Sequence, residues 1–69
     1  MKRIFIKDDY IKLGQALKLA GLVGNGADAK FVITDGQVLV NGQTEVQRGK
    51  KIREGDIIEY NGSQVTVCR

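Results

Sequence analysis

The 69-residue chain contains no histidine, no proline, no tryptophan and only one cysteine. Without histidine, and with its cysteine at position 68, it cannot assemble a Ser–His or Cys–His catalytic pair. The same lack of cysteine and histidine excludes a zinc site built from these residues, and a lone cysteine cannot form an intramolecular disulfide. The sequence therefore predicts a protein that is not an enzyme and that uses no metal and no cofactor.

Long hydrophobic runs are also missing. No stretch approaches the roughly 20 apolar residues of a membrane span. The first apolar run, Ile4-Phe5-Ile6, is too short for the hydrophobic region of a signal peptide. We therefore expect a cytoplasmic protein without a membrane partner.

The length of the chain allows one thin domain, which we place at residues 1–69. A chain of this size buries only about 60% of the surface that its unfolded form exposes, so its core must be compact. Nine glycines indicate short, tight turns. No linker or internal repeat is visible, and because nothing in the sequence requires a dimer, we expect a monomer.

Two helices are predicted in the first half of the chain. Residues 10–20 follow helical spacing, with one apolar face formed by Tyr10, Leu13, Ala16, Leu17 and Ala20. Asp8-Asp9 is expected to cap the start of this helix and Gly21 its end. Asn25 is placed to cap a second, short helix at residues 27–34, which Asp35-Gly36 ends.

The rest of the chain has the character of short strands. We expect strands at residues 3–7, before the helices, and at residues 37–40, 44–46, 57–60 and 64–68 after them. Asn41-Gly42 and Asn61-Gly62 are typical of two-residue hairpin turns. The order β-α-α-β-β-β-β predicts an α+β domain, in which two packed short helices lie against a small, mainly antiparallel sheet.

Charge is sharply divided between two neighbouring segments. Residues 47–53 carry four cations and no carboxylate, whereas residues 54–59 carry three carboxylates and no cation. Like charges gathered in one loop usually require a compensating partner. On the first helix, Lys12, Gln15 and Lys18 are three residues apart and can form a single stripe. Cations arranged along one surface gain affinity for nucleic acid by releasing counterions from its phosphates.

These segments resemble the S-four-type RNA-binding domain, also called the alpha-L RNA-binding motif, and in particular small stand-alone bacterial proteins. The resemblance runs through Lys18-Leu19-Ala20, the segment 35–42 and the basic segment 48–56, and covers roughly residues 10–60. It implies an L-shaped platform, formed by the two helices and the following strand, that binds structured RNA, namely ribosomal RNA, transfer RNA or a structured small RNA. The ribosome or its precursor is the implied partner. The residues that it places at the RNA are Lys12, Gln15, Lys18, Asn25, Lys30, Arg48, Lys50, Lys51 and Arg53.

Few aromatic side chains are available to stack on bases. Phe5 and Tyr60 fall in strand patterns and Tyr10 on the core face of the first helix, which leaves Phe31 as the candidate platform. We therefore expect recognition of folded or double-stranded RNA by its shape and phosphates rather than by its splayed bases.

An alternative function is that of a protein-interaction adaptor. The basic loop, residues 48–53, would then dock an acidic patch on a ribosomal or replication protein, with Ile11, Leu19 and Phe31 as apolar anchors. Salt dependence distinguishes the two functions, because RNA binding weakens steeply with salt and apolar docking does not.

Overall fold

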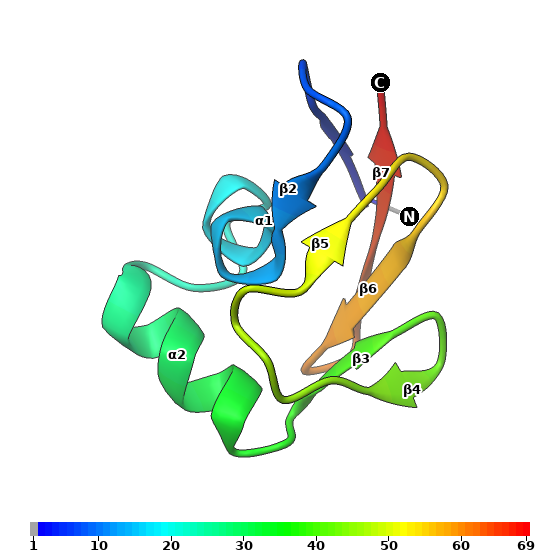
Figure 1. Cartoon of the computed structure of the whole chain (residues 1–69). Helices are drawn as coiled ribbons and strands as arrows, with labels where there is room; N and C mark the ends of the chain where they lie inside the picture. Colours follow the sequence, from blue (N-terminus) through cyan, green and yellow to red (C-terminus); the bar gives the residue numbers. More distant parts are fainter. Residues whose placement is uncertain (1) are drawn as a thin grey trace.

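The computed structural model describes residues 2–69 and shows an α+β domain, as predicted (Figure 1). Its elements are β1 (Lys2–Phe5), β2 (Ile11–Lys12), α1 (Leu13–Leu19), α2 (Gly26–Thr34), β3 (Val38–Val40), β4 (Gln43–Thr44), β5 (Lys51–Ile52), β6 (Ile57–Tyr60) and β7 (Ser63–Cys68). The order differs from the predicted one by two additional short strands, β2 and β5, which pair with each other. Within the described residues, no helix is long and apolar enough to cross a bilayer.

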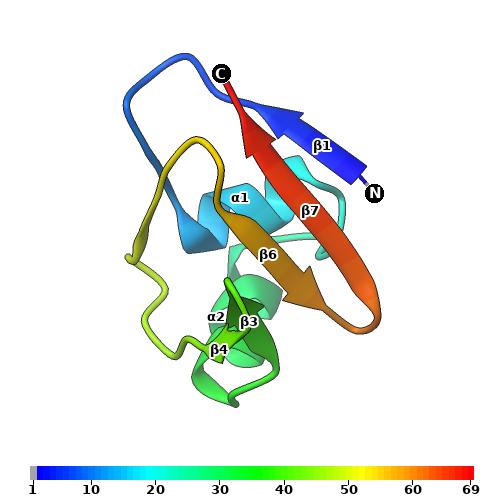
Figure 2. The same ribbon diagram turned by 90° about the vertical axis from the view of Figure 1, so that its right-hand side faces the viewer.

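The main sheet has the strand order β1-β7-β6-β3-β4. Its hairpins are antiparallel and turn at Asn41-Gly42 and Asn61-Gly62, where φ is positive at both residues of each turn. Positive φ at both positions is the geometry of a type I′ hairpin, so both predicted turns are confirmed. The parallel pairing of β1 with β7 places the first and last strands side by side (Figure 2).

The predicted helix boundaries are confirmed in part. Gly21 ends α1 in a left-handed conformation with φ of 74°, and its N–H donates to the Lys18 carbonyl at 3.0 Å. Asn25 caps α2 by accepting a hydrogen bond from the Asp28 N–H at 2.8 Å. The predicted start of α1 is wrong, because the helix begins at Leu13 and its N-cap residue, Lys12, makes no side-chain capping bond.

The cause of the shorter α1 is the second, two-stranded sheet. Residues 11–12 are extended because they pair with β5, so Asp8-Asp9 lies outside the helix and does not cap it. Lys12 is correspondingly a strand residue at the edge of the helix, and Tyr10 precedes both elements.

The two helices lie on one face of the main sheet (Figure 2), and one hydrophobic core joins them to it. Leu13, Leu17 and Ile33 come from the helices, and Ile52 comes from β5; all four are completely buried. The fully buried members from the main sheet are Val38, Ile58, Val65 and Val67. The helices and the basic loop are therefore fixed to a common core.

Two aromatic residues predicted to be buried lie at the surface instead. Phe5 is 67% exposed, because it alternates with the buried residues Ile4 and Ile6 along its strand. Tyr10 is 37% exposed, since it precedes the helix whose core face it was expected to share. Tyr60 is partly buried and packs against the core.

Candidate nucleic-acid interface

The basic loop is attached to the start of α1 by backbone hydrogen bonds. The Leu13 N–H donates to the Lys50 carbonyl at 2.9 Å, and the Gly14 N–H donates to the Arg48 carbonyl at 3.1 Å. The first N–H groups of a helix have no partners within the helix, so the loop supplies the acceptors that a capping side chain would otherwise provide. The loop is therefore held beside the helix that carries Gln15 and Lys18.

Gly14 makes this close approach sterically possible. A Cβ atom at this position would lie 2.8 Å from Cγ and 3.4 Å from Cδ of Arg48. Sequence reasoning did not single out Gly14, although a glycine inside a short helix was an available signal, since glycine disfavours helix interiors. The missing side chain lets Arg48 lie directly over the first turn of α1.

The β2–β5 pair brings two lysines from distant parts of the chain together. Ile11 is opposite Ile52, and Lys12 is opposite Lys51. Ile52 is buried in the core, whereas both lysines are exposed. Like charges directly opposite each other on neighbouring strands are destabilising. The two lysines therefore concentrate positive charge beside the start of α1.

A concave site opens next to this lysine pair. It has a volume of about 300 Å³ and is lined by Lys12, Gly14, Gln15, Lys18, Gly26, Ala29, Arg48 and Gly49. We call it the basic hollow. Three of its lining residues are cations and none is a carboxylate, and α2 begins at its edge with Gly26.

Among the described residues, the cations of the basic hollow have no anionic partner. Within residues 2–69, the one ion pair joins Arg69 to Asp9, with 3.0 Å between Nη1 and Oδ1. Lys12, Lys18 and Arg48 are therefore available to an anionic ligand. The positive end of the α2 dipole adds to this potential.

The hollow contains four of the nine predicted contact residues. Lys51 lies beside it, opposite Lys12. Lys30 is exposed on α2 outside the lining, and Lys50 lines a different depression, formed with the β3–β4 hairpin. Asn25 uses its side-chain oxygen to cap α2.

Tyr10, which sequence reasoning placed in the core, is part of the basic surface. The Lys51 Nζ atom lies 4.9 Å from the centre of its ring, and the Arg53 Cζ atom lies 5.8 Å from it. Cations at such distances are attracted by the negative face of an aromatic ring. Tyr10 thereby holds Arg53, the ninth predicted residue, next to Lys51.

Asp56, three residues after Arg53, fixes the end of the basic loop. The Asp56 carboxylate accepts hydrogen bonds from the Arg53 N–H at 2.8 Å and from Asn41 Nδ2 at 3.0 Å. Asn41 Oδ1 in turn accepts from the Ile57 N–H at 2.9 Å. These bonds connect the loop to the β3–β4 hairpin, so this carboxylate serves the backbone and does not neutralise the cations.

A family model and two sequence relatives all match most of this chain. The model of the S4 domain family matches residues 4–68. The chain is 41% identical over 59 residues to a probable ribosome maturation protein, RlbA, of Bacillus subtilis, which covers 86% of this chain and 83% of the relative. It is 38% identical over 61 residues to the putative RNA-binding protein YbcJ of Escherichia coli, with 88% and 87% covered.

The solution structure of E. coli YbcJ is similar to this fold. The two superimpose with a TM-score of 0.77 at 34% sequence identity, over 100% of this chain and 89% of the other. That structure is described as revealing an alpha-L motif involved in RNA binding. The family model, the relatives and the shared fold agree, and this chain belongs to the S4 domain family.

Proposed function

We propose that this chain binds structured RNA, with the basic hollow and the Lys12–Lys51 pair placed on phosphates. The observation that carries the proposal is the convergence of Lys12, Lys18 and Arg48 on one concave site that contains no carboxylate. Cations that are free of internal partners release phosphate counterions on binding and so gain affinity. The description of the E. coli relative as RNA-binding supports the same function.

Ribosomal RNA or its precursor is the RNA class that we favour. The relative from B. subtilis bears the name of a probable ribosome maturation protein, which connects the family to this RNA. Transfer RNA and structured small RNAs present the same phosphate chemistry and serve as comparison ligands. We propose that the protein acts by binding alone, because the sequence contains no histidine and only one cysteine from which to build a nucleophilic site.

The structure gives less support to a protein adaptor that uses the predicted apolar anchors. Ile11 is partly buried and packs against the core, so it cannot insert into a partner. Phe31 is exposed on α2 but does not line the basic hollow. Of the three anchors, Leu19 alone is both exposed and close to the basic hollow, so the three do not form one apolar docking surface beside the basic loop.

A titration with matched charge variants tests the proposal. We expect Lys12→Gln with Arg48→Gln to weaken binding to a folded ribosomal RNA fragment about tenfold or more at low salt. The slope of log K against log salt should fall by roughly two, about one for each phosphate that is no longer neutralised. Fluorescence anisotropy at several salt concentrations measures both quantities, with single-stranded RNA and duplex DNA as comparison ligands.

The control removes the same charge from another surface. Lys2 and Arg3 are exposed on β1, so Lys2→Gln with Arg3→Gln changes the net charge equally and leaves the hollow intact. We expect this control to bind almost like the wild type. Equal weakening in both double variants would show that net charge, and not the basic hollow, drives binding.

A further inference from the structure

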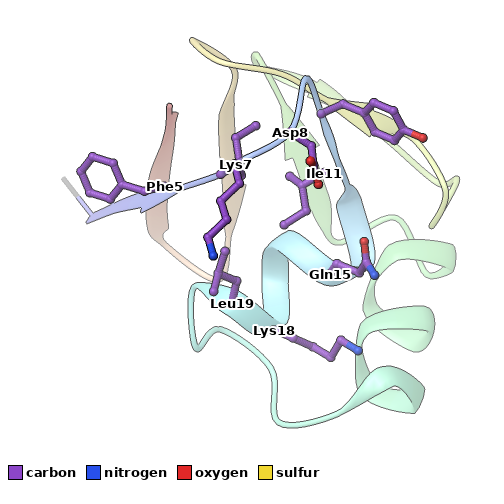
Figure 3. Close-up of a pocket in the computed structure, with 9 residues that line it drawn as sticks. Phe5, Lys7, Asp8, Ile11, Gln15, Lys18 and Leu19 are labelled. Carbon is purple, nitrogen blue, oxygen red and sulfur yellow. The ribbon is translucent and has the colours of Figure 1, made fainter.

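A second depression lies beside the basic hollow, between the segment after β1 and the exposed side of α1. Its volume is about 670 Å³, and it is lined by Phe5, Ile6, Lys7, Asp8, Tyr10, Ile11, Gln15, Lys18 and Leu19. Figure 3 shows Phe5 at one end and Gln15 and Lys18 at the other, with Ile11 and Leu19 between them. We call this depression the apolar groove.

Several large hydrophobic side chains that line the apolar groove are exposed to solvent. Phe5 is 67% exposed, Leu19 is 55% exposed and Tyr10 is 37% exposed. Single exposed apolar residues are common, but several gathered along one depression mark a binding surface. Its volume lies within the roughly 300–1,000 Å³ of ligand pockets.

Position and charge favour an anionic occupant that also reaches the basic hollow. Gln15 and Lys18 line both sites, so the groove continues directly from the hollow. The groove itself carries Lys7 and Lys18 against one carboxylate, that of Asp8. A polyanion bound in the basic hollow can therefore extend past Gln15 into the apolar groove.

We infer that the apolar groove receives an unpaired nucleobase of the RNA whose backbone lies in the basic hollow. This inference rests on the proposed function. The flat, apolar faces of a base match the side chains of Leu19 and Phe5, and the phosphates on either side of it match the two lysines. The Gln15 amide can both donate and accept hydrogen bonds at a base edge. An acidic peptide would satisfy the lysines but would not explain why the groove opens into the hollow.

The inference changes the expected specificity. From the sequence we expected most aromatic residues to be buried, and this expectation predicted recognition of RNA shape alone. In the structure, Phe5 and Tyr10 line this groove at the surface. The structure instead assigns recognition of a folded RNA that carries a bulged or looped-out nucleotide. Unstacked nucleotides of this kind are the usual targets of sequence-specific RNA recognition.

Two hairpins that share one stem test the inference, one fully paired and one with a single adenosine bulge. We expect the wild type to bind the bulged hairpin about fivefold or more tightly than the paired one. A fivefold gain in affinity is at the lower end of what the stacking of one base on a protein side chain contributes. Phe5→Thr with Leu19→Ala should abolish this preference and leave the affinity for the paired hairpin unchanged. Both substitutions keep a residue suited to its strand or helix, and both side chains are exposed, so the fold should persist.

A matched control and a direct readout complete the test. Phe31 is 62% exposed on α2 and lines neither site, so Phe31→Ala should keep the full preference for the bulge. In NMR spectra, ring currents of an inserted adenine should shift the Leu19 methyl signals when the bulged hairpin is added, and not with the paired one.

The two hypotheses fail in different ways. Equal affinity of the wild type for both hairpins, or a preference that survives in the Phe5/Leu19 variant, overturns the base site while salt-dependent RNA binding stands. Absence of binding to either hairpin at low salt overturns the proposed function itself. Leu19 methyl shifts on addition of an acidic peptide, without any response to the bulged RNA, would assign the groove to a protein and overturn the base site.

Discussion

At the scale of single residues, the position of Arg48 depends on the missing side chain of Gly14. We predict that Gly14→Ala weakens RNA binding about three- to tenfold, because the new Cβ would lie 2.8 Å from Cγ of Arg48 and push that side chain out of the basic hollow. Stability should change little, since the gain in helix propensity of about 1 kcal/mol offsets the steric cost. RNA titration and urea denaturation measure the two effects.

Gly24→Ala provides the control for this substitution. Its Cβ would meet only the Asp28 carboxylate, at 3.8 Å, and Gly24 does not line the hollow. We expect this variant to bind RNA like the wild type. Unchanged RNA affinity in Gly14→Ala would contradict a role for the close approach of Arg48.

Asn41 shows how much of a residue's role can be read from the sequence. Its position before Gly42 predicted the turn, and the left-handed φ of 52° confirms it. Its side-chain bonds to Asp56 and to the N–H of Ile57 were not predictable, because those partners lie 15 and 16 residues away. Local geometry follows from the residue, whereas its distant hydrogen-bond partners follow from the packed fold.

At the scale of elements, β5 divides the basic loop into two parts with different surroundings. Lys51 pairs with Lys12 and lies over Tyr10, whereas Lys50 lines the depression beside the β3–β4 hairpin. We predict that Lys51→Gln weakens RNA binding about three- to tenfold. Lys50→Gln should weaken it less than about twofold, because a cation at the edge of the charged surface neutralises phosphate less completely. Both variants remove one charge, so anisotropy titrations at one salt concentration compare geometry alone.

If Lys50→Gln weakened binding more than Lys51→Gln, the RNA would instead contact the side of the loop that faces the β3–β4 hairpin. Circular dichroism of both variants checks the fold, which should persist because both lysines are exposed. If the two variants were equally weakened, β5 would not orient the loop toward the hollow.

The elements that the sequence predicted correctly are those with local signals. Gly21 ends α1, Asn25 starts α2, and each Asn-Gly pair makes its hairpin. The start of α1 was missed because residues 10–12 fit a helical pattern, while their actual structure depends on pairing with β5, about 40 residues away. A strand of two residues has no periodicity to detect, so its existence is decided by the tertiary partner.

The candidate site was predicted in a similar way. Lys12, Gln15, Lys18 and Arg48 were identified by charge and by family resemblance, and they line one hollow. Their convergence follows from the bonds between the loop and the start of α1, which are made by backbone atoms and leave Gly14 as their one trace in residue type. The alternation around Phe5 was, in contrast, a readable signal, because a strand with Ile4 and Ile6 inside must turn Phe5 outward.

At the scale of the whole molecule, the residues that stabilise the fold and those proposed to bind RNA lie in different parts of the chain. The core is apolar and contains no buried polar or charged side chain among the described residues. The basic hollow and the Lys12–Lys51 pair lie outside that core and bring like charges together. Because one surface ion pair, Arg69–Asp9, is the sole ionic contact within residues 2–69, salt has little attraction to screen in this fold.

Salt should therefore act in opposite directions on folding and on binding. We predict that raising sodium chloride from about 50 mM to about 500 mM increases Tm by roughly 2–4 °C, because it screens the repulsion among the hollow's cations. The same change should weaken RNA binding, since released counterions then enter a more concentrated solution. Lys12→Gln with Arg48→Gln should have a higher Tm than the wild type at low salt and a smaller rise with salt. Differential scanning calorimetry measures these shifts, and a Tm that fell with salt, or rose equally in both proteins, would show that the cation cluster does not oppose folding.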